Sequence, residues 1–253
     1  MDYSLPPSIV RQYPQVFPWQ SHGRNVWVKK RRPNKQPILW WLQRLAYRLT
    51  GILLVLPPGR PVGDNVRFEV SMLRKLAALG VRVPEVLHVQ DDYFVMSDTG
   101  PSLEQVLASN PGGAPGLILE AARELRRFHD LGMAHGGAQI KNLTVFNNEI
   151  HFIDFEEFIP EKRLEQFQLR DLFLYLLSLE RTGNNPDLEA ICAAYGGDRF
   201  PETLTRVRRA ILQLGMVRYL KSSFFSRWSM RDIRSLIQLV SKAEKIPAPE
   251  ASC

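Results

Sequence analysis

The spacing of apolar positions predicts several strands and one helix early in the chain. The stretch "RNVWVKK" alternates apolar and polar residues around Val26 and Val28, as a half-buried strand does. Residues 64–80 show helical periodicity, with Asp64 able to cap the helix and Gly80 able to end it. Two further apolar runs, "EVLHVQ" and "YFVMSD", predict strands. The apolar stripe expected on the helix is Val66, Val70, Leu73 and Ala77.

The remainder of the chain has helical periodicity, with one exception. "SLEQVLAS" and "GLILEAARELRRFHDLG" each place apolar residues on one helical face. "NLTVFNNEIHFIDF" instead contains two short strand patterns separated by Asn147-Asn148, which predicts a hairpin. Further helices are predicted over residues 162–181, 187–195, 201–221 and 230–245.

These elements predict an α+β fold of two lobes, a small lobe that contains strands and a larger helical lobe, joined near residues 96–100. The boundaries that we expect are an N-terminal extension at 1–20, a small lobe at 21–98 with a basic helical insertion at 37–63, a helical lobe at 99–245 and a disordered tail at 246–253.

Composition narrows the class of protein. Of the 253 residues, 45% are hydrophobic and 23% are charged, which is typical of a soluble globular protein with a substantial core. Cys192 and Cys253 cannot form a disulfide framework and lie at no metal-ligand spacing. We therefore expect a reducing, cytoplasmic location, with Cys192 buried and no signal peptide. Arg44 and Arg48 interrupt the longest apolar run, so it is not expected to span a membrane.

Basic charge is concentrated in the first quarter of the chain. The net charge is +7, yet residues 1–63 contain ten Lys and Arg and one Asp, so the remainder sums to −2. Within residues 38–56, aromatic and basic side chains share one predicted helix, which suits peripheral binding to the anionic inner face of a membrane. Packing of this helix on the small lobe is the interpretation that we favour over membrane binding. No motif indicates nucleic acid.

An ordered set of polar residues carries the candidate chemistry. Phosphoryl transfer from ATP needs a cation on the phosphates, oxygen ligands for Mg²⁺ and a group that orients the attacking hydroxyl. "VWVK" ends the first strand with Lys29, and the following helix carries Glu69. "HGGAQIKN" places Asn142 seven residues after His135, and "HFIDF" places Asp154 after an apolar strand.

With Asp171 in a later helix, this order resembles the protein-kinase-like superfamily over roughly residues 20–185. It looks closest to the small bacterial lipopolysaccharide (Kdo/heptose) kinases and their atypical-kinase relatives. The resemblance implies a two-lobed fold with ATP in the cleft. It implies Lys29 (with Lys30 as a rival) and Glu69 as the phosphate-anchoring pair, Asn142 and Asp154 as Mg²⁺ ligands, the backbone of Met96, Ser97 and Asp98 as the adenine contact, and His135 and Asp171 as structural supports.

Three departures from that pattern affect the chemistry. Gly137 stands where the catalytic Asp is usual, and Glu156 stands where the last Gly of "DFG" is usual. No glycine-rich loop is evident before Lys29. Glu156, Glu157 and Asp130 are candidate substitute bases, whereas Gln139 can orient a hydroxyl but not accept its proton.

The sequence thus predicts an ATP- and Mg²⁺-dependent phosphotransferase with an atypical catalytic loop. Gln139 replaces a Lys that is usual in serine/threonine protein kinases, which favours a sugar or lipid-linked hydroxyl as acceptor. An ATP-binding pseudokinase that acts as a regulator or scaffold is the alternative, because the metal ligands are retained while the base is not. An atypical serine/threonine protein kinase is the second alternative.

Overall fold

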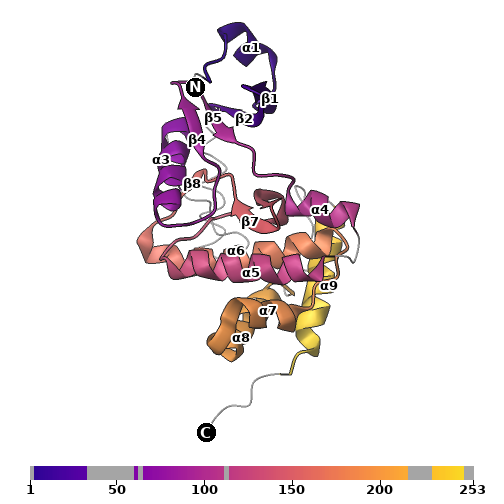
Figure 1. Cartoon of the computed structure of the whole chain (residues 1–253). Helices are drawn as coiled ribbons and strands as arrows, with labels where there is room; N and C mark the ends of the chain where they lie inside the picture. Colours follow the sequence, from indigo (N-terminus) through magenta and orange to yellow (C-terminus); the bar gives the residue numbers. More distant parts are fainter. Residues whose placement is uncertain (1–2, 33–59, 62–64, 111–113, 216–229, 248–253) are drawn as a thin grey trace.

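The predicted two-lobed α+β fold is confirmed by the computed structural model, which describes residues 3–32, 60–61, 65–110, 114–215 and 230–247 (Figure 1). The small lobe contains a four-stranded antiparallel sheet in the order β1-β2-β5-β4. The larger lobe is helical and lies below it in the figure. The sheet consists of β1 (Val16–Ser21), β2 (Arg24–Lys30), β4 (Val86–Val89) and β5 (Tyr93–Ser97).

Each face of this sheet is covered by a different part of the chain. Alternating residues of β5 point to opposite sides, so Phe94 and Met96 join the main core while Tyr93 and Val95 join a second cluster. The segment that precedes β1, including the short helix α1 (Pro7–Gln12), covers the second cluster. The members of that cluster are Tyr3, Leu5, Val10, Phe17, Val26, Val28, Tyr93 and Val95.

The helix α3 (Asn65–Ala78) packs on the other side of the sheet. Its buried residues include Glu69, and its apolar stripe differs from the predicted one at a single position. Leu76 is buried, whereas Ala77 is exposed. Gly80, with φ +77°, ends the helix in the left-handed conformation expected of glycine.

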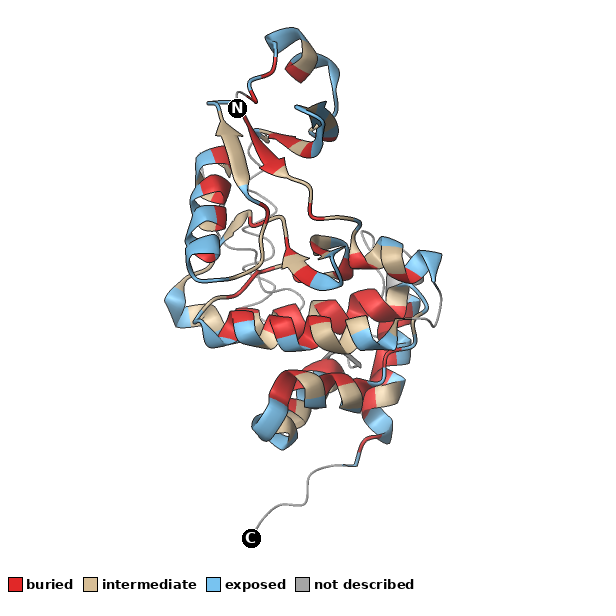
Figure 2. Cartoon of the chain, viewed as in Figure 1, coloured by how far each residue is buried: buried red, intermediate tan, exposed pale blue. Residues whose placement is uncertain are grey.

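Six longer helices and one hairpin build the larger lobe within the described residues. The hairpin of β6 (Leu143–Phe146) and β7 (Glu149–Phe152) turns at Asn147 and Asn148, which have φ 50° and 63° as a type I′ turn requires. Figure 2 shows the buried side of α5 facing the rest of the lobe. The helices are α4 (Leu103–Ser109), α5 (Pro115–Asp130), α6 (Leu164–Arg181), α7 (Leu188–Gly196), α8 (Phe200–Gly215) and α9 (Met230–Lys245).

A two-residue ladder connects chain segments from both lobes. The strand β3 (Arg60–Pro61), which precedes α3, pairs antiparallel with β8 (Glu157–Phe158), which follows Asp154. Single turns of 3-10 helix complete the lobe, namely η2 (Ile140–Asn142), η3 (Glu161–Arg163) and η4 (Gly197–Arg199).

Two sequence predictions concern membranes. In the described ranges, no helix is both long enough and apolar enough to cross a bilayer. The amphipathic helix predicted within residues 38–56 lies outside the described residues, as does most of the basic insertion at 37–63.

Cys192 is buried, as predicted.

Candidate active site

Lys29 is the centre of an ion-pair cluster between the lobes. Its Nζ lies 2.7 Å from Glu69 Oε1, 2.6 Å from Asp154 Oδ1 and 3.1 Å from Glu156 Oε1. The side chains of Lys29 and Glu69 are only 6% and 4% exposed, whereas that of Asp154 is 32% exposed. The structure therefore brings together the predicted pair and one predicted metal ligand, with the carboxylate of Asp154 open to a ligand.

Strand geometry shows which of the two adjacent lysines, Lys29 or Lys30, faces the site. Lys29 is paired with Phe94 in the ladder and faces α3, while Lys30 points to the opposite side. The Lys30 ammonium donates hydrogen bonds to the carbonyls of Val10, at 2.8 Å, and Tyr13, at 2.7 Å, at the end of α1. Lys30 thus holds the N-terminal segment, and only Lys29 reaches the carboxylates between the lobes.

The electrostatics of the cluster follow from burial and from opposite charges at short range. Burial alone would lower the pKa of Lys29, but the carboxylates of Glu69, Asp154 and Glu156 raise it above its ordinary value. Burial raises the pKa of Glu69 to about 7, although Lys29 opposes this effect. Burial would also raise the pKa of Asp154, but the charge and hydrogen bond of Lys29 hold it well below its usual range.

The backbone at Asp154 is unusual for a residue other than glycine. Asp154 has φ +72°, a left-handed conformation that side chains other than Gly and Asn adopt at a cost. The next residue, Phe155, is buried and packs its ring 4.7 Å from that of His135. The His135 Nε2 donates to the carbonyl of Ile153 at 2.8 Å. These contacts fix both sides of Asp154 and direct its carboxylate towards Lys29.

Asp171 holds the predicted catalytic loop. This residue of α6 is fully buried, and its carboxylate accepts hydrogen bonds from the backbone N–H groups of His135 at 2.6 Å, Gly136 at 3.2 Å and Ala138 at 3.2 Å. Burial would raise the pKa of Asp171, but His129 and then His135 lower it. The bracing arrangement is therefore present in the structure.

A second layer of support for the loop was missed from the sequence. His129 lies with Nε2 3.4 Å from Asp171 Oδ2 and with Nδ1 2.6 Å from the hydroxyl of Tyr195. Arg170 donates to the carbonyl of Gly136 at 2.8 Å. His129 and Arg170 each lie among several other polar residues of α5 and α6, so the sequence offers no signal that singles them out.

The position that lacks the usual base has room for a Cβ atom. A Cβ atom built on Gly137 would lie 3.9 Å from Asn142 Nδ2 and 4.0 Å from His135 Nδ1, which are ordinary contacts. Asn142 Nδ2 donates to the Gly137 carbonyl at 2.9 Å, and the backbone N–H of Gln139 donates to the same carbonyl at 2.7 Å. The loop thus keeps a compact shape without a carboxylate at position 137.

The two acidic residues after Phe155 take different positions. Glu156 is bound to Lys29 and to Arg32, with Oε2 2.6 Å from Arg32 Nη1. Glu157 instead lies against the loop, because a Cβ built on Gly136 would be only 2.8 Å from Glu157 Oε2. Gly136, with φ +83°, needs to be glycine because of its backbone conformation, whereas the flexible Glu157 side chain could move away from a Cβ atom. The candidate base Asp130 is paired with Arg126 at 2.7 Å and Arg199 at 3.1 Å.

The connector between the lobes is closely hydrogen-bonded. The backbone N–H of Ser97 donates to the carbonyl of Glu85 at 2.9 Å, and Met96 lies within the sheet. Asp98 Oδ1 accepts from Trp27 Nε1 at 3.2 Å and from the N–H of Gly100 at 3.0 Å. Since the N–H of Ser97 is already used, an adenine contact along this segment would fall mainly to the backbone of Asp98.

The donor set around Asp154 fits a nucleotide-bound Mg²⁺ ion. Across the described ranges, no group of three or more His, Cys, Asp or Glu side chains could hold a metal ion on its own. Mg²⁺ bound with nucleotide needs only one or two protein carboxylates besides phosphate oxygens and water. Asp154 offers a partly exposed carboxylate, and Asn142, which uses Nδ2 towards Gly137, keeps its amide oxygen for a ligand.

The fold and this arrangement of Lys29, Glu69, the braced loop and Asp154 resemble those of the protein-kinase-like superfamily. A family model of the RIO domain, an atypical kinase-like family, matches residues 62–185. That match begins after Lys29, so it contains Glu69, the loop, Asp154 and Asp171 but not the lysine.

Three relatives are similar to the chain over part of their length. An uncharacterized protein of Haemophilus influenzae is 26% identical over 170 residues, which cover 66% of this chain and 63% of that protein. The RIO-type serine/threonine-protein kinase Rio1 of Haloferax volcanii is 30% identical over 149 residues, 55% of this chain and 50% of Rio1. The EKC/KEOPS complex subunit BUD32 of Encephalitozoon cuniculi is 26% identical over 168 residues, 65% of this chain and 80% of BUD32.

Proposed function

We propose that the chain binds ATP with Mg²⁺ between its lobes and transfers the terminal phosphoryl group to a hydroxyl acceptor. The observation that carries this proposal is the buried contact of Lys29 with Glu69 at 2.7 Å and with Asp154 at 2.6 Å. A lysine in this position is oriented from both lobes towards the space where the phosphates would lie. The RIO match supports the proposal, since RIO kinases in general depend on ATP and Mg²⁺.

The chain's own residues supply positioning and charge in this reaction. Lys29 would hold the phosphates, and Asp154 with Asn142 would hold the metal ion, which when bound neutralises charge on the transferring group. Glu69 keeps Lys29 extended across the sheet face. Asp171 keeps the loop backbone fixed, so that an acceptor meets a constant surface.

Glu157 is the best-placed substitute for the missing base. Its carboxylate lies against Gly136, one residue before the position where the usual Asp is absent. Arg170 Nη1, 3.5 Å from Glu157 Oε2, holds the carboxylate at the loop. Glu156 is less suitable, because both of its oxygens are bound to cations. We assign to Glu157 the acceptance of the proton from the attacking hydroxyl.

The acceptor is proposed to be a sugar or lipid-linked hydroxyl, as in lipopolysaccharide kinases, because Gln139 replaces the lysine usual in protein kinases. The name of the Haloferax relative, a serine/threonine-protein kinase, favours a protein acceptor as the second candidate. Transfer of labelled phosphate from ATP to sugar, lipid-linked and peptide acceptors, run in parallel, decides between them. Phosphorylation of peptides alone would reject the first candidate.

A thermal-shift titration tests nucleotide binding itself. Mg-ATP at about 100-fold over its dissociation constant adds roughly 2.7 kcal/mol to the free energy of unfolding, or roughly 5–10 °C for a domain of this size. Asp154→Asn should abolish the part of the shift that depends on Mg²⁺, while Asp130→Asn, in which an exposed carboxylate is replaced, should not. The absence of any shift at millimolar Mg-ATP would reject the proposal.

A regulatory pseudokinase is the remaining candidate, and the glycine at position 137 favours it. It predicts a thermal shift with Mg-ATP but no transfer to any acceptor and no hydrolysis. The same two assays therefore separate an enzyme from a nucleotide-binding regulator.

A further inference from the structure

Glu156 bridges two cations in a way that a phosphate group also would. Its Oε1 lies 3.1 Å from Lys29 Nζ and its Oε2 lies 2.6 Å from Arg32 Nη1. A phosphate presents oxygens at similar spacing and with more negative charge, and arginine with lysine is a common pair for binding it. The carboxylate thus occupies a site with two cationic contacts, of which sequence reasoning identified only one.

Arg32 is positioned for such a contact by its backbone. The N–H of the preceding Arg31 donates to the carbonyl of Asp92 at 2.7 Å, which extends the sheet beyond β2. The carbonyl of Arg32 accepts from Asn65 Nδ2 at 3.3 Å, at the start of α3. The Arg32 side chain is 32% exposed, so a ligand can reach the guanidinium from solvent.

The charges of the cluster indicate that the Glu156 carboxylate would have to move away from Lys29 and Arg32 before a phosphate group could bind there. Lys29 and Arg32 carry two positive charges, while Asp154 and Glu156 balance them, and Glu69 adds negative charge when it is ionised. A polyphosphate that approached this neutral or negative cluster would gain little attraction. Removal of the Glu156 carboxylate leaves the two cations in excess of Asp154 and favours an anionic ligand.

On this basis, and resting on the function proposed above, we propose that Lys29 and Arg32 form a two-cation phosphate site for the nucleotide, and that Glu156 occupies it when no nucleotide is bound. Arg32 provides the contact that a glycine-rich loop would otherwise make, because the turn between β1 and β2 contains a single glycine, Gly23. Glu156 acts as an internal competitor that nucleotide must displace. This accounts for an acidic residue at a position where kinases usually have glycine.

The competing interpretation is that Glu156 joins Asp154 in holding the metal ion. The two interpretations predict opposite effects of Glu156→Gln. If Glu156 is a competitor, the substitution tightens nucleotide binding with and without Mg²⁺. If Glu156 is a metal ligand, the substitution weakens binding and only when Mg²⁺ is present.

The test is calorimetric titration of ATP and of inorganic pyrophosphate, each with and without Mg²⁺, into the full chain and its variants. Glu156→Gln should bind both ligands about 3- to 10-fold more tightly, as loss of one competing ion pair predicts, and Arg32→Gln should bind them roughly 10-fold more weakly. Arg32→Lys should recover part of the loss. Glu161→Gln is the matched control, since it makes the same chemical change at an exposed position of η3 and should leave both affinities unchanged.

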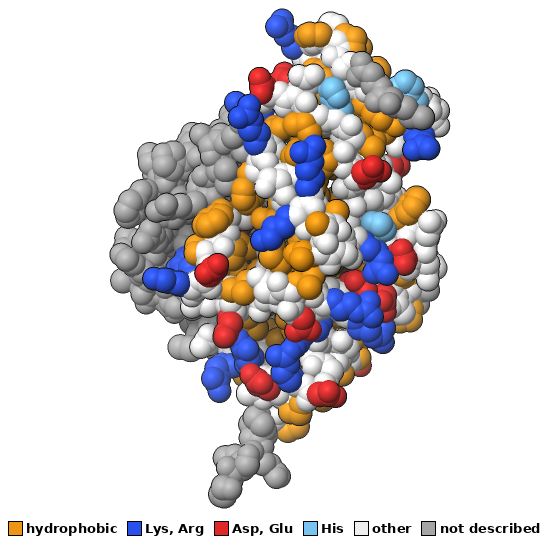
Figure 3. Space-filling view, turned by 60° about the vertical axis from the view of Figure 1, so that its left-hand side comes forward, with side chains coloured by type: hydrophobic (Ala, Val, Ile, Leu, Met, Phe, Trp, Pro, Cys, Tyr) orange, Lys and Arg blue, Asp and Glu red, His pale blue; other side chains and the backbone are white. Residues whose placement is uncertain are grey.

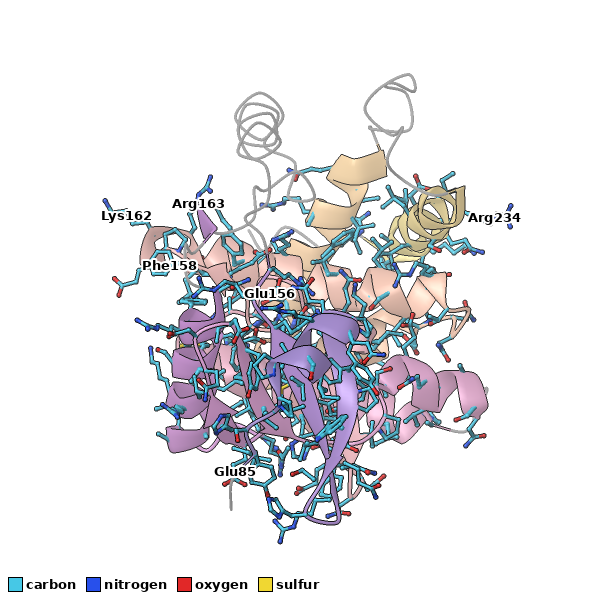
Figure 4. All side chains as sticks on the ribbon, turned by 90° about the horizontal axis from the view of Figure 1, so that it is seen from above. Glu85, Glu156, Phe158, Lys162, Arg163 and Arg234 are labelled. Carbon is cyan, nitrogen blue, oxygen red and sulfur yellow. The ribbon has the colours of Figure 1, made fainter. Side chains whose placement is uncertain are left out.

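Figure 4 shows Glu156 near the middle of the molecule when it is seen from above, whereas Lys162 and Arg163, the neighbours of the control residue, lie at its periphery. Weaker or unchanged binding in Glu156→Gln, while the wild type binds Mg-ATP, would overturn the two-cation site and leave the proposed function standing. Binding by Glu156→Gln but not by the wild type would support the two-cation site. Failure of every protein, including Glu156→Gln, to bind either ligand would overturn the two-cation site and the proposed function together.

Discussion

At the scale of single residues, two adjacent glycines of the predicted catalytic loop are subject to different constraints. Gly136 is required by its left-handed backbone conformation and lies against Glu157, whereas Gly137 has neither a positive φ nor a close contact. A Cβ atom therefore fits at position 137, yet the carboxylate that lies beside the loop is that of Glu157, which comes from a different element. The loop retains an acid at its surface although the usual acid is absent.

This arrangement predicts a rescue experiment. Glu157→Gln should lower phosphoryl transfer or ATP hydrolysis by about 10²–10⁴-fold, because the acceptor loses its base. Gly137→Asp alone should change turnover little, while the Glu157→Gln/Gly137→Asp double variant should regain much of the loss. Turnover is measured as released phosphate and as labelled acceptor, with nucleotide binding checked for each variant. Full activity in Glu157→Gln would show that Glu157 is not the base.

Glu69 gives a second prediction at this scale, because burial raises its pKa to about 7 from the ordinary 4.5. Between these two values the folded chain holds a proton that the unfolded chain has lost, so the Glu69 contribution to stability falls as pH rises through this window. Relative to the wild type, Glu69→Gln should become more stable between pH 5 and 8, by no more than about 3 kcal/mol. Urea unfolding across this range measures the difference, and parallel pH profiles of the two proteins would contradict it.

At the scale of elements, the longer helices and strands were predictable and the shortest were not. The strand β2 and the helices α3 and α5 follow clear periodicity, and the hairpin turn carries its Asn-Asn signal. The strand β1 was missed because Pro18 interrupts it, which the structure tolerates since β1 is the edge of the sheet. The two-residue strands β3 and β8 are too short for any periodic signal.

The site shows the same division between local and long-range information. The order of Lys29, Glu69, Asn142 and Asp154 predicted which side chains should meet, and all except Asn142 are joined by direct contacts of Lys29. The roles of Arg32 and Glu157 depend on which face each side chain takes after an irregular segment. No periodicity specifies that face, so the run "KKRR" and the pair "EE" gave no basis for choosing.

The helix α6 supplies a prediction at the element scale through Asp171. Asp171→Asn replaces a carboxylate that accepts three backbone hydrogen bonds with an amide that can accept at only one oxygen. We expect a loss of about 3 kcal/mol in the free energy of unfolding, together with weaker Mg-ATP binding. Tyr195→Phe, which removes only the hydroxyl near His129, should cost about 1 kcal/mol.

Chemical denaturation and calorimetry measure both quantities for each variant. Equal stability of Asp171→Asn and wild type would show that the loop does not depend on this carboxylate. A large loss of unfolding free energy in Tyr195→Phe without one in Asp171→Asn would show that the loop depends more on the Tyr195 hydroxyl than on the Asp171 carboxylate.

At the scale of the whole molecule, the N-terminal segment is part of the small lobe. Tyr3, Leu5 and Val10 cover one face of the sheet, and the N–H of Leu5 donates to the Tyr93 hydroxyl at 2.8 Å. On the face seen in Figure 3, by contrast, acidic and basic side chains are interspersed over the lower, helical part. The apolar contacts of Tyr3, Leu5 and Val10 therefore stabilise the small lobe. The sequence pattern predicted no helix or strand in this segment.

Removal of residues 1–13 should thus destabilise the small lobe. The truncation exposes the apolar side chains of Phe17, Val26 and Val95, so it should lower the melting temperature by more than 5 °C, by roughly 2–4 °C per kcal/mol lost. Tyr93→Phe, which keeps the ring but loses the hydrogen bond, should cost only about 1 kcal/mol. Differential scanning calorimetry compares the two, and an unchanged melting temperature after truncation would contradict the structural role.

The ladder of β3 and β8 limits the motions open to the two lobes. Phe155 is packed in the main core, and Glu157, two residues later, is paired with Pro61 on the path into α3. Two extended residues span at most about 7 Å, so this short tether has little slack. Separation of β3 from β8 would break the ladder. Any opening of the two lobes that keeps the ladder intact therefore leaves this edge closed.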